Sequence, residues 1–183
     1  MAKPKPAPPT VQLVAVFGKQ AKAIETAKGQ IESHWGKIKL VSQAFEHKET
    51  EYYAAEMGQG LRKQFFVIDG FYDPALLADS KLQSNTWEAS ISAQAAFSEI
   101  RPVNIDPGYI TLTKLVLASA KDRAHRIYLR DGIYAEECLY FLDGGWQSRP
   151  WTYPDYQRTD FHAFFLQARD YLKQLVASRD VSA

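Results

Sequence analysis

The side chains with the most potential for chemistry lie on both sides of an Asp131-Gly132 pair. Asp-Gly between apolar alternations is typical of a β-hairpin turn, which brings the flanking residues together. With a two-residue turn, Arg126 opposes Glu137, and His125 lies diagonally next to Glu136. With three loop residues, Arg126 opposes Glu136 instead. Either register places an imidazole, a guanidinium and a carboxylate on one small area of sheet.

Three residues are candidate catalytic groups. His125 suits proton transfer because the pKa of an imidazole lies near neutrality. Glu136 follows an apolar strand pattern, so burial would raise its pKa, or it would orient His125. Asp106 is the third candidate. Asp106 and Glu136 also carry the oxygen ligands that a hard divalent cation prefers, so a metal cofactor is an open alternative.

A second set of residues is suited to holding a small anionic ligand. Lys114, Lys121 and Arg126 would neutralise phosphate oxygens. Aromatic rings would wall or stack on the ligand. Lys81, Asn85 and Glu88 have the spacing of one helix face. The candidate ligand-binding residues are Tyr53, Glu56, Lys81, Asn85, Asn104, Tyr109, Lys114, Lys121, Arg126 and Trp151.

The same residues also fit a non-catalytic adaptor or assembly protein. Tyr, Trp and Arg are enriched at protein interfaces, and the hairpin charges would then be ion pairs that fix the strand register. Convergence of the polar residues in one concave pocket favours a phosphorylated or nucleotide-like ligand, and their dispersal favours the adaptor.

Composition limits the class of protein. The chain has 183 residues, of which 46% are hydrophobic and 23% charged, as expected for one soluble domain. A net charge of +1 argues against a nucleic-acid partner. No apolar run approaches the roughly 20 residues of a membrane span. The single cysteine and the lack of a secretory signal at the N-terminus predict a cytoplasmic protein. The oligomeric state stays open.

Periodicity and turn residues predict the order of elements. Val11–Phe17 has the pattern of a central strand, and the segment from Lys19 to Trp35 that of a helix ended by Gly36. Asp106-Pro107-Gly108 predicts a turn. Further strands are expected at 38–45, 61–71, 97–105, 110–118, 124–129, 133–142 and from 146, with helices over 73–90 and from 159.

The domain limits follow from this pattern. Residues 1–10, rich in Pro and Lys, are expected to form a disordered arm, 11–178 a single globular domain and 179–183 a tail. A strand-helix-strand-strand-helix-strand order followed by a hairpin and a closing helix predicts the α+β class. The simplest arrangement is a mostly antiparallel sheet covered on one face by helices, with a ferredoxin-like core and an added β-hairpin and C-terminal helix.

Several motifs also resemble an uncharacterised bacterial family built on a domain of unknown function. They are Tyr52-Tyr53 with Glu56-Met57-Gly58, Asn104 with Asp106-Pro107-Gly108-Tyr109, His125-Arg126-Ile127-Tyr128-Leu129, Gly132-Ile133-Tyr134-Ala135-Glu136 and Pro150-Trp151-Thr152-Tyr153-Pro154-Asp155-Tyr156. The resemblance runs from about Val11 to Leu175. Some members carry an automatic label as GTP-binding proteins, but this sequence has no phosphate-loop pattern. The resemblance therefore implies a family and no reaction.

Overall fold

The structure is a computed structural model that describes residues 3–47 and 54–181. Its first half runs β1 (Val11–Gly18), α1 (Ala21–Trp35), β2 (Ile38–Val41), β3 (Phe45–Glu46), α2 (Ala54–Met57), β4 (Arg62–Ile68), a 3-10 turn at Pro74–Leu76 and α3 (Leu77–Ser92). Its second half runs β5 (Val103–Ile110), β6 (Lys114–Ser119), β7 (Ile127–Arg130), β8 (Ile133–Leu142), β9 (Gly145–Ser148), a 3-10 turn at Pro154–Gln157 and α4 (Thr159–Val181). The α+β class is confirmed.

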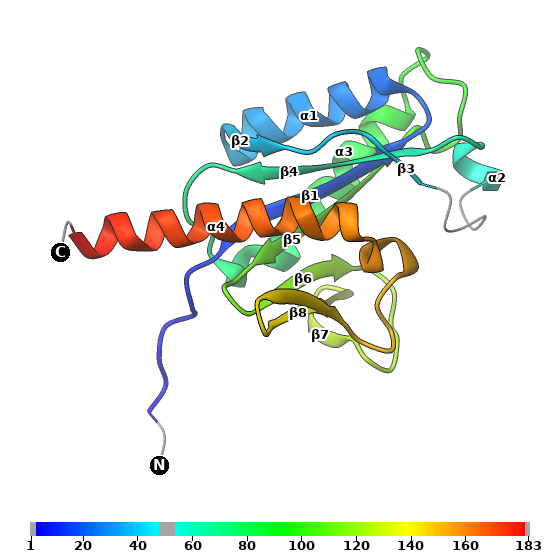
Figure 1. The fold of residues 1–183 in the computed structure, drawn as a ribbon. Coiled ribbons are helices and arrows are strands. Elements are labelled where there is room, and N and C mark those ends of the chain that lie inside the picture. Colours follow the sequence, from blue (N-terminus) through cyan, green and yellow to red (C-terminus); the bar gives the residue numbers. More distant parts are fainter. Residues whose placement is uncertain (1–2, 48–53, 182–183) are drawn as a thin grey trace.

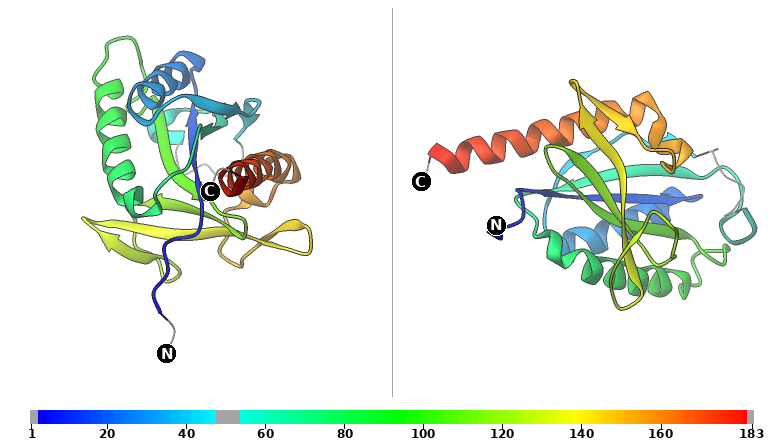
Figure 2. Two further views of the ribbon diagram at one scale, coloured as in Figure 1. Left: turned by 90° about the vertical axis from the view of Figure 1, so that its left-hand side faces the viewer. Right: turned by 90° about the horizontal axis from the view of Figure 1, so that it is seen from below.

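The predicted ferredoxin-like core is present. The core strands have the order β2-β4-β1-β5. β1 and β5 are the first and last strands of the β-α-β-β-α-β unit and lie side by side, β1 in the centre of the core and β5 at its edge. Each of these neighbours is antiparallel. β6, β8 and β7 extend the same sheet beyond β5, and β3 and β9 pair with β4 and β8. β6, β7 and β8 run at a steep angle to β1 and β4 (Figure 2, right).

Helices cover both faces of the sheet, where one covered face was expected. α1 and α3 lie on one side of β1 and β4, and α4 lies on the other (Figures 1 and 2). The reason is visible in β1, whose eight residues are all buried. A strand buried on both faces reads as a continuous apolar run, and such a run requires a second layer to cover it.

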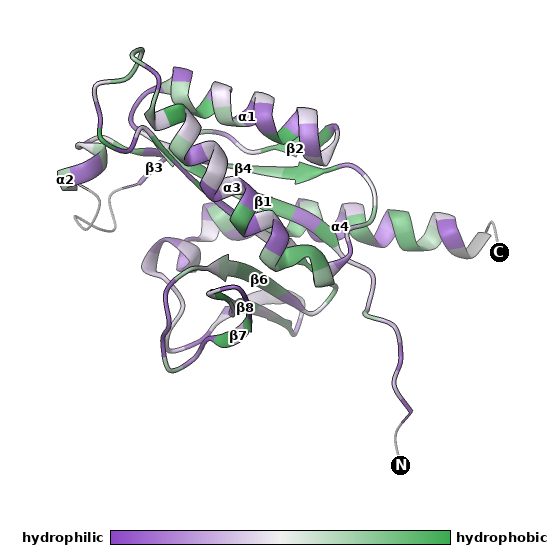
Figure 3. Ribbon diagram, turned by 180° about the vertical axis from the view of Figure 1, so that it is seen from behind, coloured by the Kyte–Doolittle hydropathy of each residue, from purple (hydrophilic) through white to green (hydrophobic). Residues whose placement is uncertain are grey.

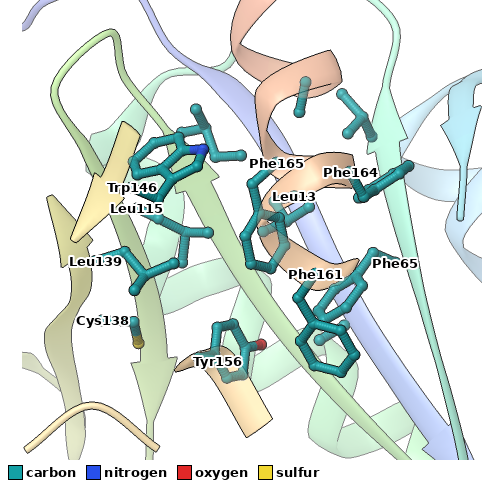
Figure 4. Packing of buried hydrophobic residues seen from close by; sticks show 14 of the residues in the cluster. Leu13, Phe65, Leu115, Cys138, Leu139, Trp146, Tyr156, Phe161, Phe164 and Phe165 are labelled. Atoms are coloured by element: carbon teal, nitrogen blue, oxygen red, sulfur yellow. The ribbon is translucent and has the colours of Figure 1, made fainter. Parts of the chain in front are cut away.

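Alternate residues of the strands therefore feed two cores. Val14 and Val16 pack with Ile24 of α1 and Trp87 of α3. The other face packs against α4, through the residues Leu13, Phe65, Leu115, Cys138, Leu139, Trp146, Tyr156, Phe161, Phe164 and Phe165 (Figure 4). Hydrophilic and hydrophobic residues alternate along the helices, and the strands between them are largely hydrophobic (Figure 3).

The hairpin forms at the predicted turn but with a different register. Asp131 and Gly132 both have positive φ, at 52° and 76°, as a type I′ turn requires. Arg130 pairs with Ile133, but a bulge after Tyr128 shifts the strand, so Ile127 pairs with Ala135. One extra residue in β7 gives the alternative register, in which Arg126 comes opposite Glu136.

The predicted turn at Asp106-Pro107-Gly108 is wrong. All three residues lie inside β5, which pairs with β1 along its whole length. Pro107 lies just outside the Gly108–Ile110 segment that pairs with β6, where a missing N–H is tolerated. A Cβ on Gly108 would lie 2.3 Å from the Val116 carbonyl oxygen, so the glycine serves a close approach of strands. The turn lies instead at Thr111, whose Oγ1 accepts the Thr113 and Lys114 amides.

The ends of the chain differ in structure. Residues 3–9 are exposed and form no helix or strand, and they lead away from the sheet (Figure 1). α4 continues to Val181, past the expected start of the tail at residue 179. No helix in the described part of the chain combines the length and apolarity of a membrane span.

Candidate functional site

A cavity of about 640 Å³ lies over the α4 side of the sheet. The register of the strands determines which residues form the floor of this cavity. Lys63, Phe17 and Asn104 are direct neighbours across β4, β1 and β5. Leu117 and Glu136 are neighbours across β6 and β8. Residues that face each other directly across antiparallel strands share one face, so five strands contribute to a single floor.

Two segments form the walls. The first, 118–126, connects β6 to β7 and contributes Ser119, Lys121, Arg123 and Arg126. The second is the Tyr153–Tyr156 segment before α4. Tyr156 is also part of the core beneath α4, where its ring stacks on Phe165 at a centroid distance of 5.8 Å (Figure 4). This segment therefore contacts both the core and the cavity.

Lys81 reaches the cavity from α3, a helix on the other side of the sheet. β5 and β6 pair only from Gly108 onward, which leaves the Ile105 backbone without a strand on that side. Lys81 Nζ and Ser84 Oγ donate to the Ile105 carbonyl at 2.9 and 3.0 Å, and Glu88 Oε1 accepts the Ile105 amide at 2.8 Å. Side chains of α3 thus replace a strand at this opening. That is why the predicted helix face turns inward.

Charged and polar side chains bind one another along the part of β5 that β6 leaves unpaired. Lys81 Nζ lies 2.9 Å from Asp106 Oδ1 and 3.6 Å from Glu88 Oε1. Asn104 Nδ2 donates to Asp106 Oδ2 at 2.6 Å. Arg101 binds Glu88 at 2.8 Å and also donates to Asn104. Burial alone would raise the pKa of Asp106. The Lys81 ammonium and the hydrogen bonds from Lys81 and Asn104 outweigh burial and lower that pKa.

At the other end of the floor, Arg126 holds Glu136. Arg126 Nε donates to Glu136 Oε2 at 2.7 Å, and the two side chains are only 4% and 2% exposed. Arg126 Nη1 donates to Ser119 Oγ and to the Lys121 carbonyl, each at 2.8 Å, and Nη2 donates to Tyr153 Oη. Burial, with the nearby Glu136 carboxylate, raises the pKa of Tyr153, so this phenol stays neutral.

His125 contacts Glu136 from outside the cavity. His125 Nε2 lies 3.5 Å from Glu136 Oε2. Its ring stacks on Trp151 at a centroid distance of 5.5 Å and an interplanar angle of 10°. The Trp151 indole is fixed in turn by a hydrogen bond to the Glu137 carbonyl. His125 is not among the lining residues, and it contacts a residue that is, Glu136.

A third buried ion pair joins the sheet to the Tyr153–Tyr156 segment. Lys63 Nζ donates to Asp155 Oδ2, and His47 Nδ1 lies 3.5 Å from the same oxygen. The Lys63 ammonium also lies over the rings of Phe17 and Tyr156, at 4.9 and 5.2 Å. Cation–π contacts and a carboxylate together compensate the burial of this lysine.

Comparison with known families connects this geometry to a sequence family. Residues 8–171 match the family described as Domain of unknown function (DUF4416). The chain belongs to that family. No curated protein and no solved structure matches the sequence. DUF4416 membership confirms the resemblance expected from the motifs and covers every residue of the cavity.

Seven of the sequence-predicted site residues line the cavity: Lys81, Asn85, Asn104, Asp106, Lys121, Arg126 and Glu136. His125 lies beside it. Glu56 is not part of the lining; its carboxylate lies 4.0 Å from Arg101 Nη1. Tyr53 lies outside the described residues. Its role stays a prediction.

Three other candidates lie elsewhere. Tyr109 faces α3 and packs near Tyr72, and burial raises its pKa. Lys114 begins β6 opposite Tyr140, at the far end of that strand from Ser119. Trp151 is not among the lining residues, and its ring stacks on His125. Glu137 pairs with Arg149 at 2.7 Å, and the expected Arg126–Glu137 pair is absent because of the β7 bulge.

The sequence reasoning missed Lys63, His47, Asp155, Arg101 and Arg123. One signal was available for Lys63, which alternates with Phe65 and Val67 and therefore shares their buried face. His47 lies in a charged stretch of the sequence, which is typical of a solvated loop, but it is only 8% exposed. Its partner Asp155 is 108 positions away along the chain, and no spacing rule connects them.

The described residues contain no group of three or more His, Cys, Asp or Glu side chains arranged to hold a metal ion. The two carboxylates that were candidates for a cation, Asp106 and Glu136, are bound instead by Lys81 and Arg126. A divalent cation would need further oxygens from a ligand.

Proposed function

We propose that this protein binds a small phosphorylated or nucleotide-like molecule in the cavity. The observation that carries the proposal is the charge of the lining: six basic side chains and three carboxylates, in a chain of net charge +1. A cleft lined by an excess of positive charge attracts negatively charged ligands. The basic residues are Lys63, Lys81, Arg101, Lys121, Arg123 and Arg126.

These cations divide into two groups. Lys63, Lys81, Arg101 and Arg126 each bind a carboxylate of this protein, so they build the frame of the cavity. Lys121 and Arg123 are exposed residues of the lining. An exposed guanidinium can bind phosphate oxygens in bidentate fashion without losing an internal partner. The volume of about 640 Å³ also lies within the roughly 300–1,000 Å³ of small-molecule sites.

An enzymatic reaction is a further part of this proposal. Asp106 and Glu136 line the cavity, and Glu136 contacts the imidazole of His125. A carboxylate that orients an imidazole is a common arrangement for proton transfer. The single cysteine and the family resemblance support a bacterial, cytoplasmic setting.

A thermal-shift series tests the binding proposal. The probes are inorganic phosphate, ribose 5-phosphate, glucose 6-phosphate, AMP and GTP, each with and without Mg²⁺. A ligand at 100 times its Kd stabilises by about 2.7 kcal/mol, which raises Tm by roughly 5–10 °C for a chain of this size. We expect at least one phosphorylated probe to reach this range.

A matched pair of variants locates the site. Lys121→Gln/Arg123→Gln removes two charges from the cavity, and Lys22→Gln/Lys37→Gln removes two exposed charges elsewhere. The shift should fall in the first variant and stay in the second. Equal shifts in both variants, or no shift with any probe, would refute the proposal.

One observation favours the alternative of an adaptor or assembly protein. β7 ends the strand order, and its Ile127 and Tyr128 are 72% and 58% exposed. Its hydrophobic residues lie at the lower edge of the molecule (Figure 3). Exposed apolar side chains on an edge strand favour pairing with another chain. Ile127→Lys tests this alternative by sedimentation velocity. A parent that sediments as a monomer would count against it.

A further inference from the structure

We infer that the ligand carries a hydrogen-bond donor, a hydroxyl or amino group, in addition to its anionic group, and that Glu136 recognises this donor. The inference rests on the proposed function and adds the second half of the recognition. The ligand class is a phosphate monoester with a hydroxyl or amino group on its carbon skeleton.

The first observation is an unsatisfied oxygen. Glu136 is 1% exposed and lines the cavity. Its Oε2 accepts from Arg126 Nε, whereas its Oε1 is buried and has no hydrogen-bond partner among the described residues. Buried polar atoms are nearly always hydrogen-bonded, so an exception in a cavity wall indicates a group that binds there.

The second observation is that the neighbouring donors are already engaged. The three nitrogens of Arg126 donate to Glu136, to Ser119 and the Lys121 carbonyl, and to Tyr153. Arg126 therefore holds the carboxylate through Oε2, and none of the hydrogen bonds from its three nitrogens goes to Oε1. An ionised carboxylate only accepts hydrogen bonds, so whatever satisfies Oε1 must bring an N–H or O–H.

The third observation is that the cavity has a separate residue for the anionic group of the ligand. Arg123 is exposed, lines the same cavity, and forms no side-chain hydrogen bond or ion pair among the described residues. The lining also includes Phe17, Leu117 and Tyr156, which suit a carbon skeleton. One cavity thus offers a cation, an apolar surface and an acceptor. A phosphate ester with a hydroxyl or amino group matches all three.

The experiment uses matched phosphate esters on the unmodified protein. Glycerol 1-phosphate is compared with propyl phosphate, and ribose 5-phosphate with pentyl phosphate, by titration calorimetry. The second member of each pair has the phosphate and no carbon-bound hydroxyl. We expect at least one hydroxylated ester to bind ten times more tightly or better than its partner. Equal affinities within every pair would refute the inference and leave the anion site supported. Absence of binding by all four esters would also contradict the inference, whereas the anion site itself is refuted only if the nucleotide and sugar phosphate probes of the thermal-shift series fail as well.

Two variants assign the discrimination to Glu136. In Glu136→Gln the amide carbonyl can still accept from Arg126 Nε, which puts an NH₂ donor at the position of Oε1. The tenfold preference, measured as the ratio of the two affinities within each pair of esters, should fall below threefold. Glu137→Gln is the control, because Glu137 is the next residue of β8, binds Arg149 and does not line the cavity. An unchanged preference in Glu136→Gln, or an equal loss in Glu137→Gln, would contradict the inference.

Discussion

The Arg126–Glu136 pair gives the sharpest test of how the site is held together. Both side chains are almost fully buried, at 4% and 2% exposure, and their closest atoms are 2.7 Å apart. Arg126→Met keeps an unbranched chain of similar length but leaves a buried carboxylate without its cation. Breaking a buried pair in this way costs about 3–5 kcal/mol. With a urea m-value of about 2 kcal/mol/M, the unfolding midpoint should fall by roughly 1.5–2.5 M.

Two further variants complete the test. Arg126→Met/Glu136→Gln removes the buried charge as well, and it should recover more than half of the lost stability. Arg149→Met breaks a pair of the same length, 2.7 Å, whose partners are 37% and 31% exposed. Exposed pairs contribute about 0–1 kcal/mol, so Arg149→Met should stay within that range. A loss below 1 kcal/mol in Arg126→Met, or no recovery in the double variant, would refute the reasoning.

Three other outcomes follow from the structure. Gly108→Ala should lower the unfolding free energy by about 2 kcal/mol or more, because the new Cβ would meet the Val116 carbonyl, whereas Gly29→Ala in α1 meets nothing within 4 Å and should stabilise by up to about 1 kcal/mol, both measured by urea unfolding. Since Lys81 lowers the folded pKa of Asp106, that carboxylate stabilises the fold above its ordinary pKa of 3.8 and loses this contribution as pH falls through the lowered value, so Asp106→Asn should show a shallower loss of stability below pH 4 than the parent. The Cys138 thiol is fully buried, and burial raises its pKa well above the ordinary value, so a thiol reagent at pH 8 should modify it only after denaturant is added; rapid reaction of the native protein would contradict this placement.

Local sequence patterns were sufficient for the core of the fold. The apolar run Val11–Phe17, the helical spacing that ends at Trp35 and the Asp131-Gly132 turn each depend on near neighbours, and each element forms where it was expected. The order of these elements was enough to indicate a ferredoxin-like core, because right-handed crossovers leave few ways to arrange a β-α-β-β-α-β unit.

The local errors have a tertiary cause. Asp106-Pro107-Gly108 has the composition of a turn, but β1 supplies a partner for every residue from Val103 to Ile110. Pairing along a central strand outweighs the weak local preference of three residues. The bulge after Tyr128 is similar, since the sequence allowed two registers and the folded sheet selects one.

The candidate site was only half predictable, and charge pairing over long sequence distances is the reason. His125, Arg126 and Glu136 were found because one short hairpin connects them. The Lys63–Asp155 pair joins β4 to a segment 92 positions later, and Lys81 reaches Asp106 only because β6 leaves part of β5 unpaired. Neither of these two ion pairs corresponds to a regular spacing in the sequence from which it could be predicted. Each of these lysines nevertheless lies in line with buried apolar residues, where an unpaired ammonium would be costly. A lysine in such a position therefore implies a carboxylate that is distant in the sequence. Here the carboxylates of two such lysines, Asp155 and Asp106, line the same cavity, which indicates a site that forms only when the whole chain is folded.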